Sequence, residues 1–232
     1  MMERIDLKTL SPAELENLVI ELGWESFRAR QIMSWLYQKR ISDIDFMTNL
    51  SLRLRNELKR TAFISCLPPS QVLTSRDGTR KYLFSLGDGG CIESVLIPNR
   101  DHLTLCISTQ RGCGLKCRFC YTGREGFIRD LTTAEIINQI ESVLNHLGDT
   151  DRLRNIVFMG MGEPLDNYDN TLRALEIIFH PHGFNFSHRR VTLSSAGLIP
   201  ELRRLGRDNP VNLAISLNAA DNQTRSFLMP VN

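Results

Sequence analysis

The chain has 232 residues, of which 42% are hydrophobic and 23% charged, and its formal net charge is +2. This is an ordinary composition for a globular protein long enough to bury a sizeable core. Charges throughout Met1 to Lys8 exclude a secretory signal there, and no apolar run is long enough for a membrane span. Six cysteines, three of them clustered, fit a reducing compartment better than a disulfide framework. We therefore expect a cytoplasmic protein without a membrane segment.

Residues 10–60 predict a helical module. Ser11 to Glu14 form a capping box with proline at the first helical position, and Gly23 ends the helix that follows. Basic residues crowd this first quarter: Arg28, Arg30, Lys39, Arg40, Arg53, Arg55, Lys59 and Arg60. Such a cluster can meet phosphates, and it can equally be a solvated helix face.

A β-rich stretch follows the boundary that Pro68-Pro69 marks. Two runs, 81–86 and 91–97, are separated by a glycine-rich turn and predict short strands. Alternation in the second run puts Glu93 on the face opposite Ile92, among apolar neighbours. Glu93 is either a functional carboxylate or a solvated one at the rim of the sheet.

From Leu103 onward, strand patterns alternate with helical patterns. Strands are expected over 103–108, 155–159, 190–194 and 211–217, with helices between them. This alternation predicts parallel βαβ units. If the sheet curls, the loops at the carboxyl ends of the strands converge on one mouth.

The most informative loop carries Cys113, Cys117 and Cys120 in the spacing C-x3-C-x2-C. Three thiolates on one loop can hold three irons of a [4Fe-4S] cluster and leave the fourth iron open to a small molecule. Radical S-adenosylmethionine (SAM) enzymes are recognised by this spacing. The alternative, a structural zinc site, needs a fourth ligand, and no Cys or His follows Cys120 at zinc-finger spacing.

Other unusual segments also follow strands. Gly160 to Pro164 supplies accessible backbone and the carboxylate of Glu163, which can accept from a ligand ammonium group. Ser194, Ser216 and Asn218 can bind a cofactor or simply cap the next helix. Cys106 is a further thiol near the mouth, although a free cysteine is usually a small buried hydrophobe.

With these residues assembled, the chain resembles the RlmN/Cfr family of radical SAM RNA adenine methyltransferases. The matching segments are Ile92–Pro98, Cys106–Cys113, Cys117 and Cys120 with Thr122-Gly123, Gly126-Phe127, Met159–Leu165, Val191–Ser195, Leu213–Leu217 and Leu228–Asn232. The resemblance implies an α/β fold: a partial (βα) radical SAM barrel with about four of roughly six strands present. A small helical accessory domain that contacts RNA precedes it. The expected divisions are 1–65 for that domain, 66–102 for a β-rich connecting segment and 103–232 for the radical SAM core.

The resemblance also implies a reaction, which is methylation of carbon 2 of an adenine in 23S rRNA and in tRNA next to the anticodon. Cys113, Cys117 and Cys120 would hold the cluster. The SAM site would be lined by Gly162, Glu163, Ser194, Ser216, Leu217 and Asn218. Glu93 would accept the proton, and Cys106 would resolve a protein–RNA adduct through a transient disulfide.

Two features depart from the family pattern. Asn218 stands where many members have histidine, and no cysteine follows Cys120 to carry the methyl group that the family's mechanism requires. We therefore expect a truncated, monomeric product that binds cluster and SAM, takes electrons from a flavodoxin-like donor and does not methylate RNA alone. The alternatives are another radical SAM reaction, an iron–sulfur electron carrier or an inactive RNA-binding remnant.

Overall fold

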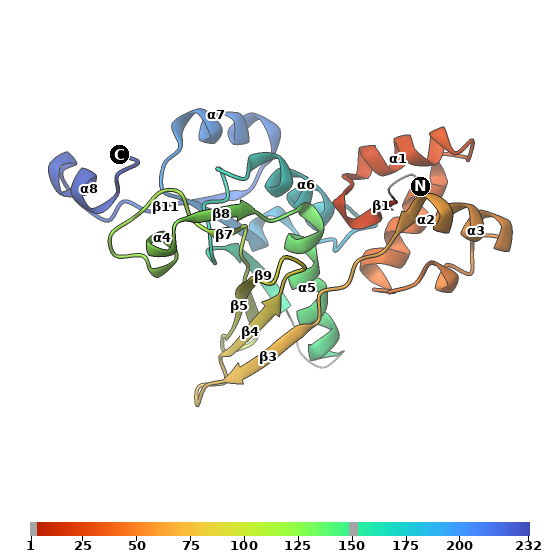
Figure 1. Cartoon of the computed structure of the whole chain (residues 1–232), viewed down its shortest axis with the longest axis horizontal. Helices are drawn as coiled ribbons and strands as arrows, with labels where there is room; N and C mark the ends of the chain where they lie inside the picture. The colour runs from red at the N-terminus through yellow and green to blue at the C-terminus, as the bar shows by residue number, and fades with distance from the viewer. Residues whose placement is uncertain (1–3, 149–152) are drawn as a thin grey trace.

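The computed structural model describes residues 4–148 and 153–232. Its described residues form a seven-stranded mixed sheet in the order β11-β10-β9-β6-β5-β4-β3, with a helical module at one end of the molecule (Figure 1). No helix in these ranges is long and apolar enough to cross a membrane. The predicted α/β class is confirmed.

The N-terminal module is mainly helical, as expected. Its elements are β1 (Ile5–Asp6), η1 (Leu7–Thr9), α1 (Pro12–Glu21), α2 (Phe27–Met33), the π-helical turn η2 (Ser34–Gln38), η3 (Ile44–Phe46), α3 (Leu52–Thr61) and β2 (Ala62–Phe63). The predicted capping box is present: the Ser11 hydroxyl accepts from the Glu14 amide at 3.2 Å, and the Glu14 carboxylate accepts from the Ser11 amide at 2.8 Å. A parallel pairing of β1 with β2, which the sequence did not predict, joins the two ends of the module.

Two ion pairs join this module to the rest of the chain. Lys8 is fully buried, and its ammonium lies 2.7 Å from the Glu141 carboxylate of α5 (Thr133–Leu147). The same ammonium donates to Asn138 Oδ1 and to the Ser65 carbonyl, both at 2.8 Å. Arg173 of α6 (Tyr168–Phe179) binds Glu14 at 2.9 Å. The buried pair is the stronger constraint, because losing one partner leaves an uncompensated charge in the interior.

Four parallel strands form one side of the sheet, as the βαβ pattern predicts. They are β6 (Leu103–Cys106), β9 (Leu153–Phe158), β10 (Val191–Ser195) and β11 (Asn212–Ile215), and α5, α6 and α7 (Ile199–Asp208) run between them. β6 ends at Cys106, two residues before Ser108, where the sequence predicted its end. The Ser108 amide donates to the Gln139 side chain instead of to a neighbouring strand, and the Ser108 hydroxyl donates to the Glu93 carbonyl. Side chains of α5 at Ile136, Ile137, Ile140 and Val143 are fully buried. Each such side chain contributes about 1.5–3 kcal/mol.

The stretch expected to be a connecting segment extends the same sheet. β3 (Pro69–Thr74), β4 (Arg80–Ser85) and β5 (Cys91–Pro98) are antiparallel and join the edge of β6. The predicted alternation in β5 is confirmed, since Ile92, Ser94 and Leu96 are buried and Glu93 lies on the opposite face.

A small hairpin that the sequence did not predict brackets the cysteine loop. Its strands are β7 (Gln110–Gly112) and β8 (Phe127–Asp130), with α4 (Tyr121–Glu125) inside the loop; η4 (His188–Arg190) and α8 (Asn222–Leu228) complete the fold. Gly112 has φ of +72°, and a Cβ there would lie 1.8 Å from the Gly126 carbonyl oxygen. Glycine is therefore required where the hairpin opens into the cysteine loop.

Candidate cofactor site

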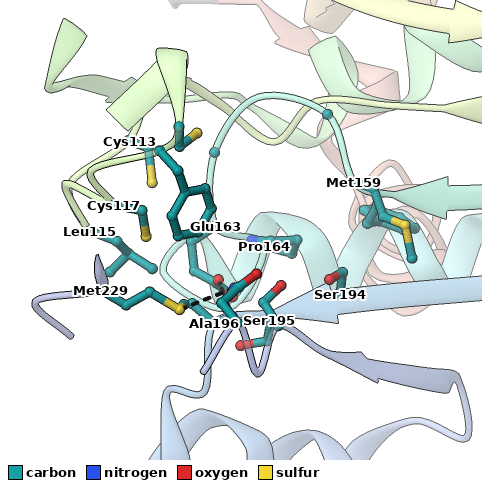
Figure 2. A pocket seen from close by; sticks show the side chains of 17 residues that line it. Cys113, Leu115, Cys117, Met159, Glu163, Pro164, Ser194, Ser195, Ala196 and Met229 are labelled. Carbon is teal, nitrogen blue, oxygen red and sulfur yellow. Dashed lines mark hydrogen bonds between the residues drawn. The ribbon is translucent and has the colours of Figure 1, made fainter. Parts of the chain in front are cut away.

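A cavity of about 340 Å³ opens where the carboxyl ends of β9 and β10 meet the cysteine loop (Figure 2). Its lining residues are Cys113, Leu115, Cys117, Phe119, Cys120, Phe158, Met159, Gly160, Gly162, Glu163, Pro164, Ser194, Ser195, Ala196, Ser216, Asn218 and Met229. The structure thus brings the predicted cluster cysteines together with Gly162, Glu163, Ser194, Ser216 and Asn218. Leu217, also expected at the SAM site, does not line the cavity and is 64% exposed.

The three loop cysteines suit a multi-iron group. Burial raises the pKa of the Cys113 and Cys117 thiols, and negative charge on neighbouring thiolates and on Glu163 raises both further. A cationic metal in contact with these thiols would remove that penalty and favour the thiolates. No three His, Cys, Asp or Glu side chains in the described ranges are grouped to hold one ion. The donor set fits a cube, in which each thiolate binds a different iron, better than a mononuclear zinc site.

Close backbone packing shapes the cysteine loop. The Cys120 amide donates to the Cys117 carbonyl at 3.0 Å, and Lys116 adopts a left-handed φ of +54°. A Cβ at Gly123 would lie 3.2 Å from the Cys117 amide nitrogen. The loop is therefore a built turn, and Gly123 lets α4 pack against it.

Glu163 is buried, 4% exposed, and both its carboxylate oxygens already accept backbone hydrogen bonds. Oε1 accepts from the Leu165 amide at 3.2 Å, and Oε2 accepts from the Ala196 amide at 2.8 Å. Burial raises the pKa of this carboxyl despite hydrogen bonds from Ala196 and Ser195. Glu163 thus ties the loop after β9 to the loop after β10, a role that its position in the sequence did not suggest.

The two glycines before Glu163 are explained by packing against the segment after β6. A Cβ at Gly160 would lie 2.6 Å from Ser108 Oγ, and one at Gly162 would lie 2.5 Å from Gln110 Cβ. Gly162 also has φ of +98°. Only glycine allows the backbone of this loop to approach the cysteine-loop hairpin so closely.

Polar groups at the ends of β10 and β11 complete the wall. Ser194 pairs with Ala214 in the parallel register, so Ser194 and Ser216 lie on the same face of the sheet. The Asn218 side-chain amide donates to the Met229 sulfur at 3.2 Å. Ser194 and Ser216 both line the cavity, and a hydroxyl can donate to or accept from a ligand.

Comparison with known proteins fits this arrangement. Residues 5–64 match the family described as "Ribosomal RNA large subunit methyltransferase N-terminal domain", and residues 107–232 match the radical SAM superfamily. The chain is 49% identical over 231 residues to the "Dual-specificity RNA methyltransferase RlmN" of Syntrophobacter fumaroxidans, covering 100% of this chain and 68% of that one. The chain belongs to the RlmN family. Membership of the radical SAM superfamily implies a [4Fe-4S] cluster and SAM as cofactors.

Two further relatives support this assignment to the RlmN family. The protein of the same name from Geobacter sulfurreducens is 54% identical over 228 residues, covering 98% of this chain and 62% of the relative. A crystal structure of a radical SAM methyltransferase from Sphaerobacter thermophilus superposes with a TM-score of 0.88 at 40% identity, covering 98% of this chain and 68% of that one. The chain therefore spans about two thirds of the length of these relatives.

The two predicted catalytic residues of this RlmN-family chain, Glu93 and Cys106, are not among the residues that line the cavity. Cys106 pairs with Val95 across β5 and β6, so it shares a sheet face with Glu93. The Glu93 carboxylate is 41% exposed and lies 2.9 Å from the Lys81 ammonium. Burial raises the pKa of the Cys106 thiol, which accepts a hydrogen bond from the amide of Met159, a residue of the cavity wall.

The cysteines carry no disulfide in the described structure. All six are free thiols, with Cys66 and Cys91 exposed rather than buried as small hydrophobes. The transient disulfide that the resemblance implies for Cys106 is therefore not present here.

Sequence reasoning missed the part that the C-terminal segment plays in an RlmN-family cavity. Met229 is 1% exposed and forms part of the wall. The Arg225 guanidinium donates to the carbonyls of Ala196, at 2.6 Å, and Leu217, at 3.2 Å, and so holds the ends of β10 and β11 together. In the sequence, the run from Leu228 to Asn232 is marked only by its match to the family, and no periodic pattern indicates that Arg225 has a structural role.

Proposed function

We propose that this chain is the radical-generating part of an RNA adenine methyltransferase. Its substrate would be carbon 2 of an adenine in 23S rRNA and in tRNA next to the anticodon, and its route would pass through a methylated cysteine. One observation carries the proposal: Cys113, Cys117 and Cys120 line the same cavity as Gly162 and the loops after β10 and β11.

The protein groups divide between holding the cluster and holding SAM. Cys113, Cys117 and Cys120 would ligate three irons, and the bound cluster would supply the electron that cleaves SAM. The Ser194 and Ser216 hydroxyls would hold polar groups of SAM, and Glu163 would keep its two loops at the right separation. Phe158, Met159 and Met229 make much of the wall apolar, which limits water around the reacting groups.

RNA recognition is assigned to the N-terminal module. Its match to a ribosomal RNA methyltransferase N-terminal domain supports this role, as does the name RNA methyltransferase that its relatives carry. On α3, Arg53 and Arg60 are exposed and available for phosphates. The same positive charge remains compatible with a solvated helix, so salt-dependent RNA binding is the relevant test.

We assign Glu93 as the proton acceptor and Cys106 as the thiol that resolves the adduct. The Lys81 ammonium, 2.9 Å from the Glu93 carboxylate, would orient that carboxylate on its face of the sheet. Cys106 would need a change in its surroundings to become a reactive thiolate, because burial now raises its pKa. No cysteine follows Cys120, so a methyl-carrying cysteine downstream of the cluster loop is not among these 232 residues. We further propose a flavodoxin-like electron donor, a monomeric state and a cytoplasmic location.

Anaerobic reconstitution with iron and sulfide, followed by dithionite and SAM, tests this function. The 232-residue chain should release 5′-deoxyadenosine and leave rRNA and tRNA unmethylated. Cys113→Ala, Cys117→Ala and Cys120→Ala should each abolish the release, and Cys91→Ala, which changes an exposed cysteine outside the loop, should not. A chain that is only an electron carrier would bind the cluster without releasing 5′-deoxyadenosine.

A further inference from the structure

A second cavity, of about 650 Å³, lies at the amino ends of β9 and β10, at the end of these strands opposite the cofactor site. We call it the basic cavity. The charged residues that line it are Arg40, Arg154 and Arg190, and no Asp or Glu is among the described lining residues. Three guanidinium groups around one space, with no carboxylate among the described lining residues, favour an anionic ligand.

The three arginines come from separate parts of the fold. Arg40 follows η2 in the N-terminal module, Arg154 lies at the start of β9, and Arg190 immediately precedes β10. The junction that carries them is well fixed, because Gln38 donates to the Pro181 carbonyl at 2.8 Å and the rings of Tyr37 and Phe184 lie 5.4 Å apart. The three guanidinium groups therefore line one cavity where the N-terminal module meets the strands β9 and β10.

Each guanidinium keeps donors available for a ligand. Arg40 uses Nε for Asn145 Oδ1 at 2.8 Å, and Arg154 uses Nη1 for Asp101 at 3.2 Å. Arg190 makes a long contact of 3.5 Å from Nη1 to Asn155 Oδ1. A guanidinium has five N–H donors, so these single bonds leave most of each fork unoccupied.

The carboxylates that the structure describes near the cavity, Asp101 and Glu141, offset its positive charge only in part. Asp101 is 68% exposed and also accepts from the His102 ring, so it offsets Arg154 only in part. Glu141 interacts electrostatically with Arg40, but the Glu141 carboxylate is already paired with the Lys8 ammonium. Among the described groups, the basic cavity keeps a positive balance.

The backbone of the cavity also suggests a selected geometry. Arg40 and Asn185 both line it and both have left-handed φ, of 51° and 57°. Residues other than glycine rarely adopt this conformation, and it persists where the surroundings require it. At Arg40, this backbone sets the direction of a charged side chain.

We propose that the basic cavity binds a phosphate group through Arg40, Arg154 and Arg190. The planar fork of arginine matches phosphate oxygens, so the ligand class is a phosphate of an RNA backbone or of a free nucleotide. An RNA phosphate here would give the substrate a second anchor, remote from the cofactor cavity. Binding of an RNA phosphate rests on the proposed function, whereas binding of a free nucleotide does not.

The double variant Arg154→Gln/Arg190→Gln tests the site, because Arg154 and Arg190 lie at the ends of strands and make few internal bonds. The matched control is Arg203→Gln/Arg207→Gln, which removes the same charge from exposed positions of α7 outside the cavity. Binding of labelled tRNA is measured by fluorescence anisotropy between about 50 and 200 mM salt. Thermal unfolding with ATP and with inorganic phosphate forms the second arm.

If the ligand is an RNA phosphate, the cavity variant should lose about tenfold or more in tRNA affinity, with its salt slope reduced by about one to two, and the control should change less. If the ligand is a free nucleotide, tRNA binding should match the control and the stabilisation by ATP or phosphate should disappear. Arg154→Lys/Arg190→Lys, which keeps the charge and loses the fork, should fall between. Equal behaviour of cavity variant and control in both assays overturns the proposal. Release of 5′-deoxyadenosine should be unchanged in every variant, which separates this result from any failure of the proposed function.

Discussion

The Ala196 amide donates a 2.8 Å hydrogen bond to Glu163 Oε2, so one buried carboxylate joins the loops that follow β9 and β10. These loops supply Gly162 and Ala196 to the wall of the cofactor cavity. The bond therefore sets the width of the cavity on the side facing the cysteine loop. Glu163 acts by positioning backbone, and its carboxylate is already bound on both oxygens.

Glu163→Gln tests this role. A glutamine amide keeps the shape but presents only one acceptor oxygen, so one backbone N–H loses its partner. We expect SAM affinity to fall about tenfold, with a loss of stability of about 1–3 kcal/mol. Equilibrium binding of SAM to the reconstituted protein and urea unfolding measure the two effects. Unchanged SAM affinity in a folded variant would show that the two loops keep their spacing without this carboxylate.

Gly112→Ala should prevent the cysteine loop from forming. The new methyl group would collide with the Gly126 carbonyl, and φ is +72° at this position. The variant should bind less iron after reconstitution, as measured by iron content and visible absorbance. Gly206→Ala in α7 is the matched control, because no atom lies within 4 Å of its added Cβ. That change should leave iron binding intact and raise stability by up to about 1 kcal/mol.

The buried ion pair between module and barrel should dominate their docking. Lys8→Met leaves Glu141 buried without its partner and should cost about 3–5 kcal/mol in urea unfolding. Adding Glu141→Leu should restore much of that loss, because no buried charge then remains. Lys59→Met removes a half-exposed partner of Asp45 and should cost at most about 1 kcal/mol. Equal losses for Lys8 and Lys59 would contradict this ranking.

Asp88 gives the cysteine-loop hairpin a dependence on pH. The Arg129 guanidinium, the Gly90 amide and Arg111 hold the pKa of this carboxyl well below its usual value of 3.8. Because the folded-state pKa is lowered, the stabilisation is complete above about pH 4 and is lost as pH falls through the acid range. Asp88→Asn should unfold at a lower temperature than the wild type at pH 7, and the difference should shrink at pH 3. A difference that is constant with pH would rule out the ionised pairing as its source.

The features that the sequence predicted correctly are those that depend on residues close together in the chain or on a repeating pattern of apolar residues. The capping box at Ser11 depends on neighbouring residues, and the alternation of strands and helices after Leu103 depends on the spacing of apolar residues; the box and the parallel strands are both present. The C-x3-C-x2-C spacing indicated the cluster loop because its three ligands lie within eight residues.

The contacts that the sequence did not reveal join distant segments. Glu163 meets Ala196, Arg225 meets Ala196 and Leu217, and the β7–β8 hairpin closes through Gly112 and Gly126. None of these partners is marked by periodicity or by a motif. Leu217 lies outside the cavity for a local reason, because alternation along the chain after β11 places Ser216 inward and Leu217 outward.

The central claim is that the three cysteines leave one iron open to SAM inside this cavity. Electron paramagnetic resonance of the dithionite-reduced, reconstituted protein, recorded before and after SAM is added, tests it most directly. The account predicts a [4Fe-4S]⁺ signal whose g values shift on adding SAM, in the wild type and not in Gly112→Ala. A cluster signal that SAM leaves unchanged in the wild type would contradict it.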